Sequence, residues 1–127
     1  MDTREKILTA EEAIAVARRL GGELRIVSGW FDPLLAAHAR RLMDLKQGHA
    51  RLMVVLTNPP QPILPARARA ELVAALAAVD YVVVAGGPSP EGLLARMGCA
   101  GAVRAEPDDG RIAREFIRHV HTRQRAG

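Results

Sequence analysis

The sequence contains little cysteine and few aromatic residues. Cys99 is the only cysteine among 127 residues, which excludes an internal disulfide framework. Aromatic residues make up 3% of the chain, so stacking platforms for single-stranded nucleic acid are scarce. We therefore expect Cys99 to be a small core residue in a reducing, cytoplasmic environment, and we do not expect nucleic acid to be a partner.

Long apolar segments are also missing. No run approaches the roughly 18–20 residues that cross a bilayer, so we expect no membrane partner. Four of the first six residues are charged, and no apolar stretch of a secretory signal follows them, which also favours the cytoplasm. The length suits one domain, and the sequence shows no internal repeat, low-complexity segment or second-domain boundary, so one domain covering residues 1–127 is expected.

The charge balance permits an anionic ligand without requiring one. The net charge is +4, and 16 of the 18 basic residues are arginine, an excess that a GC-rich genome also produces. A positive surface favours a nucleotide or a small phosphorylated ligand. The basic residues near the C-terminus are interpreted as a solvated helix face, with an anion-binding patch as the alternative; they are Arg111, Arg114, Arg118, His119, His121, Arg123 and Arg125.

Helical and strand patterns alternate along the chain. Thr9 and Glu12 have capping-box spacing at the start of a first helix, which Gly21 ends. Short apolar runs predict strands at 24–28, 51–57, 81–85 and 100–104. Helices are expected at 34–47, 66–79 and 89–98, with Leu72, Leu76 and Val79 buried. A last helix is expected after Pro107-Asp108-Asp109-Gly110, with Ile112, Ala113, Phe116, Ile117 and Val120 on one apolar face. This alternation predicts a parallel sheet in a Rossmann-like, three-layer α/β/α fold.

The loop after the first predicted strand is the natural ligand site. In an open parallel sheet, ligands bind beyond the carboxyl ends of the strands. Gly29 permits close backbone approach there, and the loop runs into a helix whose free N–H groups suit phosphate. His38, near the start of that helix, is a candidate phosphate donor, and a packed core histidine is the alternative. Neither a dinucleotide fingerprint nor a P-loop is present.

A family resemblance rests on the segment around this loop. It reads Ser28-Gly29-Trp30-Phe31-Asp32-Pro33-Leu34-Leu35-Ala36-Ala37-His38. This segment resembles the strand, loop and helix of the cytidylyltransferase-like nucleotidyltransferases, which include glycerol-3-phosphate cytidylyltransferase and the nucleotidyltransferase domain of ADP-heptose synthases. Their pattern is a glycine, one residue, Phe-Asp, and then His-x-Gly-His. The resemblance extends from about residue 8 to residue 108, and residues 70–83 look especially like the heptose-synthase branch.

The resemblance implies a reaction and a set of site residues. A substrate phosphate would attack the α-phosphorus of CTP or ATP, with Mg²⁺, and release pyrophosphate. His38 matches the second histidine and is the implied catalytic residue, whereas no residue is expected to bind a metal. The residues implied to contact the nucleotide or its phosphates are Gly29, Trp30, Phe31, Ala37, His38 and Arg69. Asp32 is the candidate for binding substrate, with a turn or helix-capping role as its alternative, and a homodimer is implied.

Several groups of the family pattern are missing. Leu35 replaces the first histidine, and Ala37 replaces the glycine of the motif. No lysine occurs in residues 47–127, so the family's catalytic lysine has no counterpart. Losing one charge-stabilising donor typically slows a reaction roughly 10²–10³-fold. We therefore expect a nucleotide- or phosphate-binding protein whose catalysis is lost or weak.

Two alternatives remain open at this stage. An active nucleotidyltransferase would have to replace the lysine with Arg67, Arg69 or Arg104 and would move CMP or AMP onto a sugar or polyol phosphate. A non-enzymatic, oligomeric interaction module would instead bury the former site.

Overall fold

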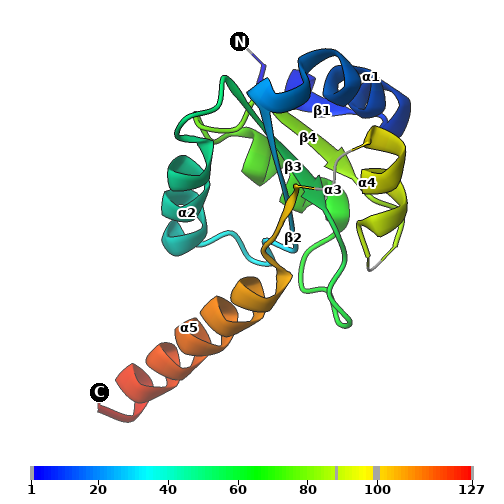
Figure 1. The fold of residues 1–127 in the computed structure, drawn as a ribbon. Helices are drawn as coiled ribbons and strands as arrows, with labels where there is room; N and C mark the ends of the chain where they lie inside the picture. The colour runs from blue at the N-terminus through cyan, green and yellow to red at the C-terminus, as the bar shows by residue number, and fades with distance from the viewer. Residues whose placement is uncertain (1, 88, 99–100, 127) are drawn as a thin grey trace.

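The protein is built around one sheet of five parallel strands (Figure 1). The computed structural model describes residues 2–87, 89–98 and 101–126, with side chains described to residue 120 except that of Ala113. The strands are β1 (Ile7–Leu8), β2 (Leu24–Gly29), β3 (Arg51–Leu56), β4 (Tyr81–Val84) and β5 (Val103–Arg104), and their order in the sheet is β1-β4-β3-β2-β5. The predicted Rossmann-like α/β fold is confirmed.

Five α-helices accompany the strands. They are α1 (Ala10–Leu20), α2 (Ala36–Lys46), α3 (Ala66–Ala74), α4 (Glu91–Met97) and α5 (Glu106–Ala126), with short 3-10 turns at Thr3–Lys6 and Gly21–Glu23. In Figure 1, α2 lies on one side of the sheet and α1 and α4 lie on the other. Strand β3 is buried continuously from Leu52 to Leu56, and because successive side chains of a strand point to opposite faces, it packs against helices on both sides.

Each face of the sheet has its own apolar core. Leu52 and Val54 of β3 pack with Leu42 of α2 and Val73 of α3. The intervening Met53 and Val55 pack instead against α1 and α4, where the buried helix residues are Ala13, Ala17, Leu94 and Met97. The continuous apolar run of β3 therefore reflects burial on both faces, as expected for a central parallel strand.

The predicted capping box is present at the start of α1. The Glu12 backbone N–H donates to Thr9 Oγ1 at 3.2 Å, and the Thr9 backbone N–H donates to Glu12 Oε1 at 2.9 Å. These two bonds satisfy donors that a helix N-terminus leaves without intrahelical partners. Helix α4 ends at Gly98, which adopts the left-handed conformation with φ of 70°.

Three details differ from the sequence-based expectation. The short edge strand β1, which pairs with β4, was not predicted. The last helix begins at Glu106, so the segment Pro107–Gly110 forms its first turn instead of a preceding loop. Helix α3 ends at Ala74, and Leu72 is exposed, because the buried face of α3 is formed by Arg69, Ala70, Val73 and Ala74.

Helix α5 extends away from the body of the molecule (Figure 1). Phe116 and Ile117, predicted to lie on its apolar face, are 46% and 48% exposed. Among the described residues, no helix is long and apolar enough to cross a membrane. The predictions for Cys99 and for the side chains of His121, Arg123 and Arg125 fall outside the described part of the structure.

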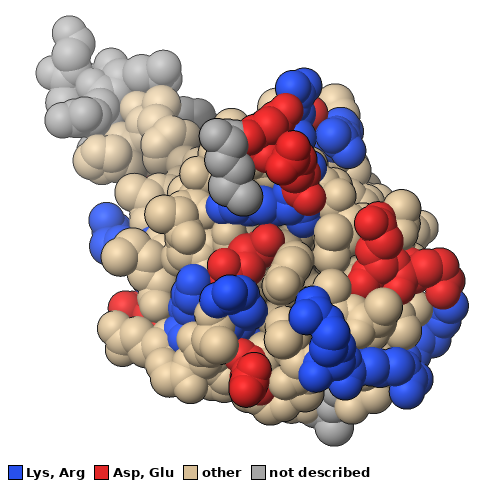
Figure 2. Space-filling model, turned by 90° about the horizontal axis from the view of Figure 1, so that it is seen from above, with Lys and Arg blue, Asp and Glu red and all other residues tan. Residues whose placement is uncertain are grey.

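Surface charge is mixed on the face seen from above in Figure 2. Basic and acidic side chains lie interspersed among uncharged ones there. Several of the exposed basic residues are paired, for example Arg96 with Glu11 at 2.7 Å and Arg111 with Glu115 at 3.2 Å. These pairs support the interpretation of a solvated surface at those positions.

Candidate active site at the carboxyl edge of the sheet

The candidate site lies where the order of the strands reverses. The chain leaves β2 toward β3 on one side, whereas β5, the last strand, pairs with β2 on the other. The main chain continues these pairings beyond the strands: Thr57 N donates to Gly29 O at 2.9 Å, and Ala105 N donates to Ser28 O at 2.8 Å. Such a reversal is where open α/β sheets place their ligands.

The loop between β2 and α2 turns inward at Phe31. Phe31 has a positive φ of 47° and is almost fully buried. Its ring meets the His38 ring edge-on, with the ring centroids 5.5 Å apart and the planes at 74°. This non-glycine residue in the left-handed region is held by core packing. The structure thus brings together Phe31 and His38, two of the predicted site residues, as packing partners.

His38 is the third residue of α2 and is only 2% exposed. Its Nδ1 accepts a hydrogen bond from the Leu35 backbone N–H at 2.9 Å, so a neutral imidazole carries its proton on Nε2. That Nε2 lies 3.2 Å from Asp109 Oδ1 without completing a hydrogen bond. His38 Nε2, the predicted phosphate donor, therefore faces the Asp109 carboxylate of the same chain.

Asp109 contacts the loop as well as the histidine. Its Oδ2 accepts a hydrogen bond from the Trp30 backbone N–H at 2.7 Å, and the side chain is 4% exposed. At Gly29, an added Cβ would lie 2.7 Å from this Oδ2 and 2.6 Å from Phe31 Cε2. The close backbone approach that Gly29 was expected to offer a ligand is therefore taken up by Asp109 and Phe31.

Glu106 occupies the ends of the two central strands. Its Oε1 accepts a hydrogen bond from Ser28 Oγ at 2.8 Å, and its Oε2 accepts one from Thr57 Oγ1 at 2.9 Å. Sequence reasoning did not single out Glu106 or Asp109 as site residues. Both residues lie in the first turn of α5, where negative side chains are stabilised by the helix dipole. A helix start placed at Glu106 from the sequence would have drawn attention to them.

Arg69 is 1% exposed and donates to four oxygens. The acceptors are Leu64 O at 3.0 Å, Trp30 O at 3.0 Å, Thr57 O at 2.9 Å and Asn58 Oδ1 at 2.6 Å. These bonds join the loops that follow β2 and β3. Arg69 thus lies beside the candidate site, but its guanidinium is engaged by the protein itself.

The other two arginines proposed as lysine substitutes are paired with carboxylates. The Arg67 side chain is 63% exposed, and its Nε lies 3.2 Å from Glu71 Oε1. Arg104 Nη2 donates to Glu91 Oε2 at 2.8 Å. The Arg104 hydrogen bond is the main cause that lowers the pKa of Glu91 below its usual value.

The remaining predicted residues surround the loop. Asp32 accepts hydrogen bonds from the Ile63 backbone N–H at 2.6 Å and the Leu64 backbone N–H at 2.9 Å, which ties the loop after β2 to the loop after β3. Trp30 is half-buried, and its Nε1 has no hydrogen-bond partner. Ala37 lines a shallow hollow between α2 and α5. These contacts engage the Asp32 carboxylate in a link between two loops of the protein.

Glu106 and Asp109 are two carboxylates at the candidate site. Among the described residues, no three His, Cys, Asp or Glu side chains are grouped so that they could hold an ion. Glu106 and Asp109 each accept hydrogen bonds from neighbouring groups, as given above. Mg²⁺ is usually held by one or two carboxylates together with substrate phosphates. A Mg²⁺ ion here would therefore need a bound phosphate in addition to these two side chains.

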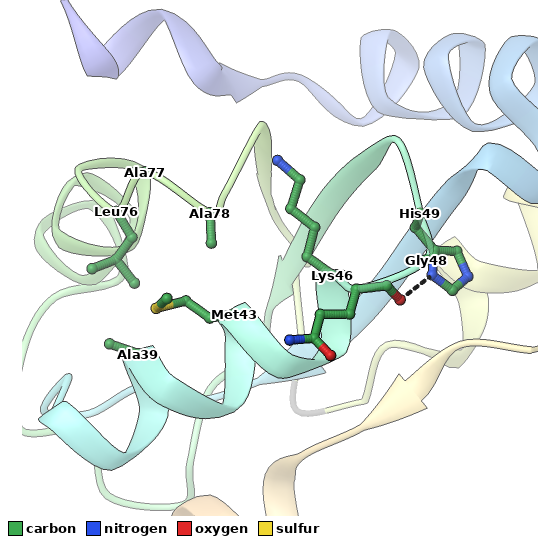
Figure 3. Close-up of a pocket in the computed structure, with 9 residues that line it drawn as sticks. Ala39, Met43, Lys46, Gly48, His49, Leu76, Ala77 and Ala78 are labelled. Atoms are coloured by element: carbon green, nitrogen blue, oxygen red, sulfur yellow. Dashed lines mark hydrogen bonds between the residues drawn. The ribbon is translucent and has the colours of Figure 1, made fainter.

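A separate apolar hollow lies at the opposite end of α2 (Figure 3). Its volume is about 530 Å³, and its apolar lining comes from Ala39, Met43, Leu76, Ala77 and Ala78. Lys46 lies at its edge and pairs with Asp80 at 3.1 Å. Since these residues precede β3 and β4, the hollow is at the amino edge of the sheet and does not include the His38 site.

The chain is similar in sequence to curated proteins named bifunctional protein HldE. No protein-family model matches the chain. The chain is 33% identical to the bifunctional protein HldE of Sodalis glossinidius over 94 residues, which is 67% of this chain and 20% of the relative. It is 32% identical to HldE of Shigella sonnei over 106 residues, or 74% of this chain and 22% of the relative.

The matched region is a small part of these relatives. The chain spans about a fifth of the length of the relatives it matches. Together with the parallel sheet, the matches support the resemblance at the level of the nucleotidyltransferase-like superfamily.

Proposed function

We propose that this chain is a nucleotidyltransferase-fold domain that has lost nucleotidyl transfer. The observation that carries the proposal is the position of the Asp109 carboxylate, which contacts Trp30 N at 2.7 Å and lies 3.2 Å from His38 Nε2. These are the groups that an incoming phosphate would need. Two like charges about 4 Å apart repel by roughly 4 kcal/mol at an effective dielectric constant near 20, so a polyphosphate is strongly disfavoured beside Asp109.

The remaining groups support the same conclusion. Leu35 stands where the resemblance expects a first histidine and has no polar side-chain atom. Arg69 already donates to four oxygens of the protein, so it is a poor substitute for a mobile catalytic lysine. Since each missing donor costs roughly 10²–10³ in rate, the expected rate lies far below that of an intact site.

A turnover assay tests this proposal. The purified protein is incubated with Mg²⁺, CTP or ATP and a panel of sugar and polyol phosphates, and pyrophosphate release is measured. We expect no release above that of the protein-free control. Turnover that is abolished in His38→Ala and retained in His49→Ala would overturn the proposal and establish the active alternative. His49 is the matched control because it lies at the opposite end of α2, in the loop before β3.

A second candidate function is a non-enzymatic module that pairs with a second copy of itself. It is favoured by the exposed Phe116 and Ile117 on the projecting helix α5. We expect light scattering to find a dimer in the wild type and a monomer in the double variant Phe116→Asp, Ile117→Asp. A wild type that stays monomeric across the accessible concentration range would exclude this candidate. Ile63→Asp is the control, since Ile63 is an exposed apolar residue on the separate loop between β3 and α3.

A further inference from the structure

The first turn of α5 carries three carboxylates that contact β2, the residue after β3, the loop after β2 and helix α2. Glu106 accepts hydrogen bonds from Ser28 and Thr57, and Asp109 contacts Trp30 and His38. Asp108 Oδ2 lies 3.0 Å from Arg41 Nη1 near the surface of α2. One turn of one helix thus contacts both central strands, the loop after β2 and the start of α2.

Beyond this turn, most of the described side chains of α5 are exposed. The side chains of residues 114–119 lie on the surface, and the helix projects from the body (Figure 1). The acidic first turn therefore supplies the polar contacts that hold α5 over the site. Helix α5 is in this respect unlike α1 and α4, which are held by apolar side chains in the core.

The Asp109 carboxylate faces two N–H donors from the loop after β2 and the start of α2. The Trp30 backbone N–H precedes α2, His38 lies in the first turn of α2, and their N–H groups both face the Asp109 carboxylate. The His38 Nε2 is buried and still lacks a hydrogen-bond partner of its own, so the donor set is not fully satisfied by Asp109. Since anions are favoured at such a helix start, a better-placed oxyanion would compete for the same groups.

We propose that α5 is an intramolecular inhibitor of anion binding, with Asp109 as the residue that occupies the anion position. The inference rests on the proposed function, because it concerns the same site. A phosphate-bearing ligand binds only when the Asp109 carboxylate is removed, either by neutralising its charge or by withdrawing the first turn of α5. The inhibited state is the state seen in the structure.

Neutralising Asp109 without changing its shape tests the inference. Pyrophosphate is titrated by calorimetry into the full-length wild type and into Asp109→Asn, which keeps an oxygen to accept from Trp30 N. We expect a wild-type Kd weaker than about 1 mM and a Kd at least about tenfold tighter in Asp109→Asn. Asp108→Asn is the matched control, because it removes the same charge from the same turn but lies against Arg41. It should bind like the wild type.

The contrary outcomes are distinct. Equal tightening in Asp108→Asn would show a general charge effect and overturn the inference, as would a wild type that binds as tightly as Asp109→Asn. Absence of binding in all three folded proteins would also overturn it. These outcomes concern pyrophosphate affinity, whereas the turnover assay measures pyrophosphate release. A negative result in one experiment therefore does not decide the other proposal.

A measurement on the wild type covers the case in which Asp109→Asn does not fold. Pyrophosphate at increasing concentration is followed by amide NMR of the isotope-labelled protein. We expect the amide signals of Trp30, Glu106, Asp108 and Asp109 to shift together, because the anion displaces Asp109 from its donor. Shifts confined to the Arg40 and Arg41 surface, with Trp30 unmoved, would refute the displacement.

Discussion

Asp109 Oδ1 lies 3.2 Å from His38 Nε2, and the two side chains come from helices that begin 70 residues apart. The contact makes His38 part of the packing between α2 and α5. The residue that sequence analysis placed at the catalytic centre therefore carries structural contacts on both ring nitrogens. Its replacement has consequences for stability that do not depend on any ligand.

We predict that His38→Ala destabilises the fold by roughly 1–3 kcal/mol. The change removes the acceptor for the Leu35 backbone N–H and the ring that packs on Phe31, and it leaves the Asp109 carboxylate buried beside a void. The measurement is the free energy of unfolding from urea denaturation. His49→Ala, in the loop between α2 and β3, should change that free energy by less than about 0.5 kcal/mol. Equal effects in the two variants would contradict the structural role of His38.

Arg69 and Arg67 lie two residues apart on α3 but have opposite environments. We predict that Arg69→Met costs about 3 kcal/mol or more, because it leaves three buried or partly buried carbonyl oxygens and Asn58 Oδ1 without their donor. Arg67→Met should cost less than about 1 kcal/mol, since the exposed pair with Glu71 contributes little. Thermal melting of both variants measures the difference. A similar loss of stability in the two variants would mean that the Arg69 hydrogen bonds do not hold the two loops together.

Gly29 is predicted to be intolerant of a side chain. In Gly29→Ala the new Cβ would approach Phe31 Cε2 at 2.6 Å and Asp109 Oδ2 at 2.7 Å, so the loop must move. Overpacking of this kind typically costs about 1–3 kcal/mol, measured here as the free energy of unfolding. Gly86→Ala is the control, because no atom of the described residues lies within 4 Å of the position where its Cβ would be built. Wild-type stability in Gly29→Ala would show that Asp109 is not packed against the loop.

The layers of the fold were predictable because the sequence pattern is local. The apolar run of β3 and the capping box at Thr9 each depend on residues close together in the chain. The edge strand β1 was missed because two residues are too few to show a period. The start of α5 was missed because Pro-Asp-Asp-Gly is typical of a turn, although a proline and acidic residues are also tolerated in the first turn of a helix.

The site was predictable in place but not in its contacts. The loop after β2 and His38 do lie at the reversal of strand order, as topology required. The pairing of His38 with Asp109 joins residues 71 positions apart, which no local pattern encodes. The burial of Arg69 runs against the general preference of arginine for the surface, so Leu72 was expected inside in its place.

The capping box at α1 gives a prediction for pH dependence. The hydrogen bond from the Thr9 backbone N–H is the main cause that lowers the pKa of Glu12 below its usual value, and the Thr9 side chain adds to it. A carboxyl group whose pKa is lower in the folded state contributes stability above its unfolded pKa, and the contribution is lost as pH falls through the folded pKa. The Glu12 contribution should therefore be present at neutral pH and disappear in acid, below the usual glutamate range.

Replacing Thr9 tests this coupling. Thr9→Ala removes the side-chain acceptor but keeps the backbone donor, so we expect the pKa of Glu12 to rise part of the way toward its usual value. The loss of the cap should cost about 1 kcal/mol in the free energy of unfolding at neutral pH. NMR titration of the Glu12 carboxyl carbon in wild type and variant measures the pKa. If Glu12 titrates at its ordinary value in the wild type, the reciprocal hydrogen bonds do not persist in solution, and α1 begins without its capping box.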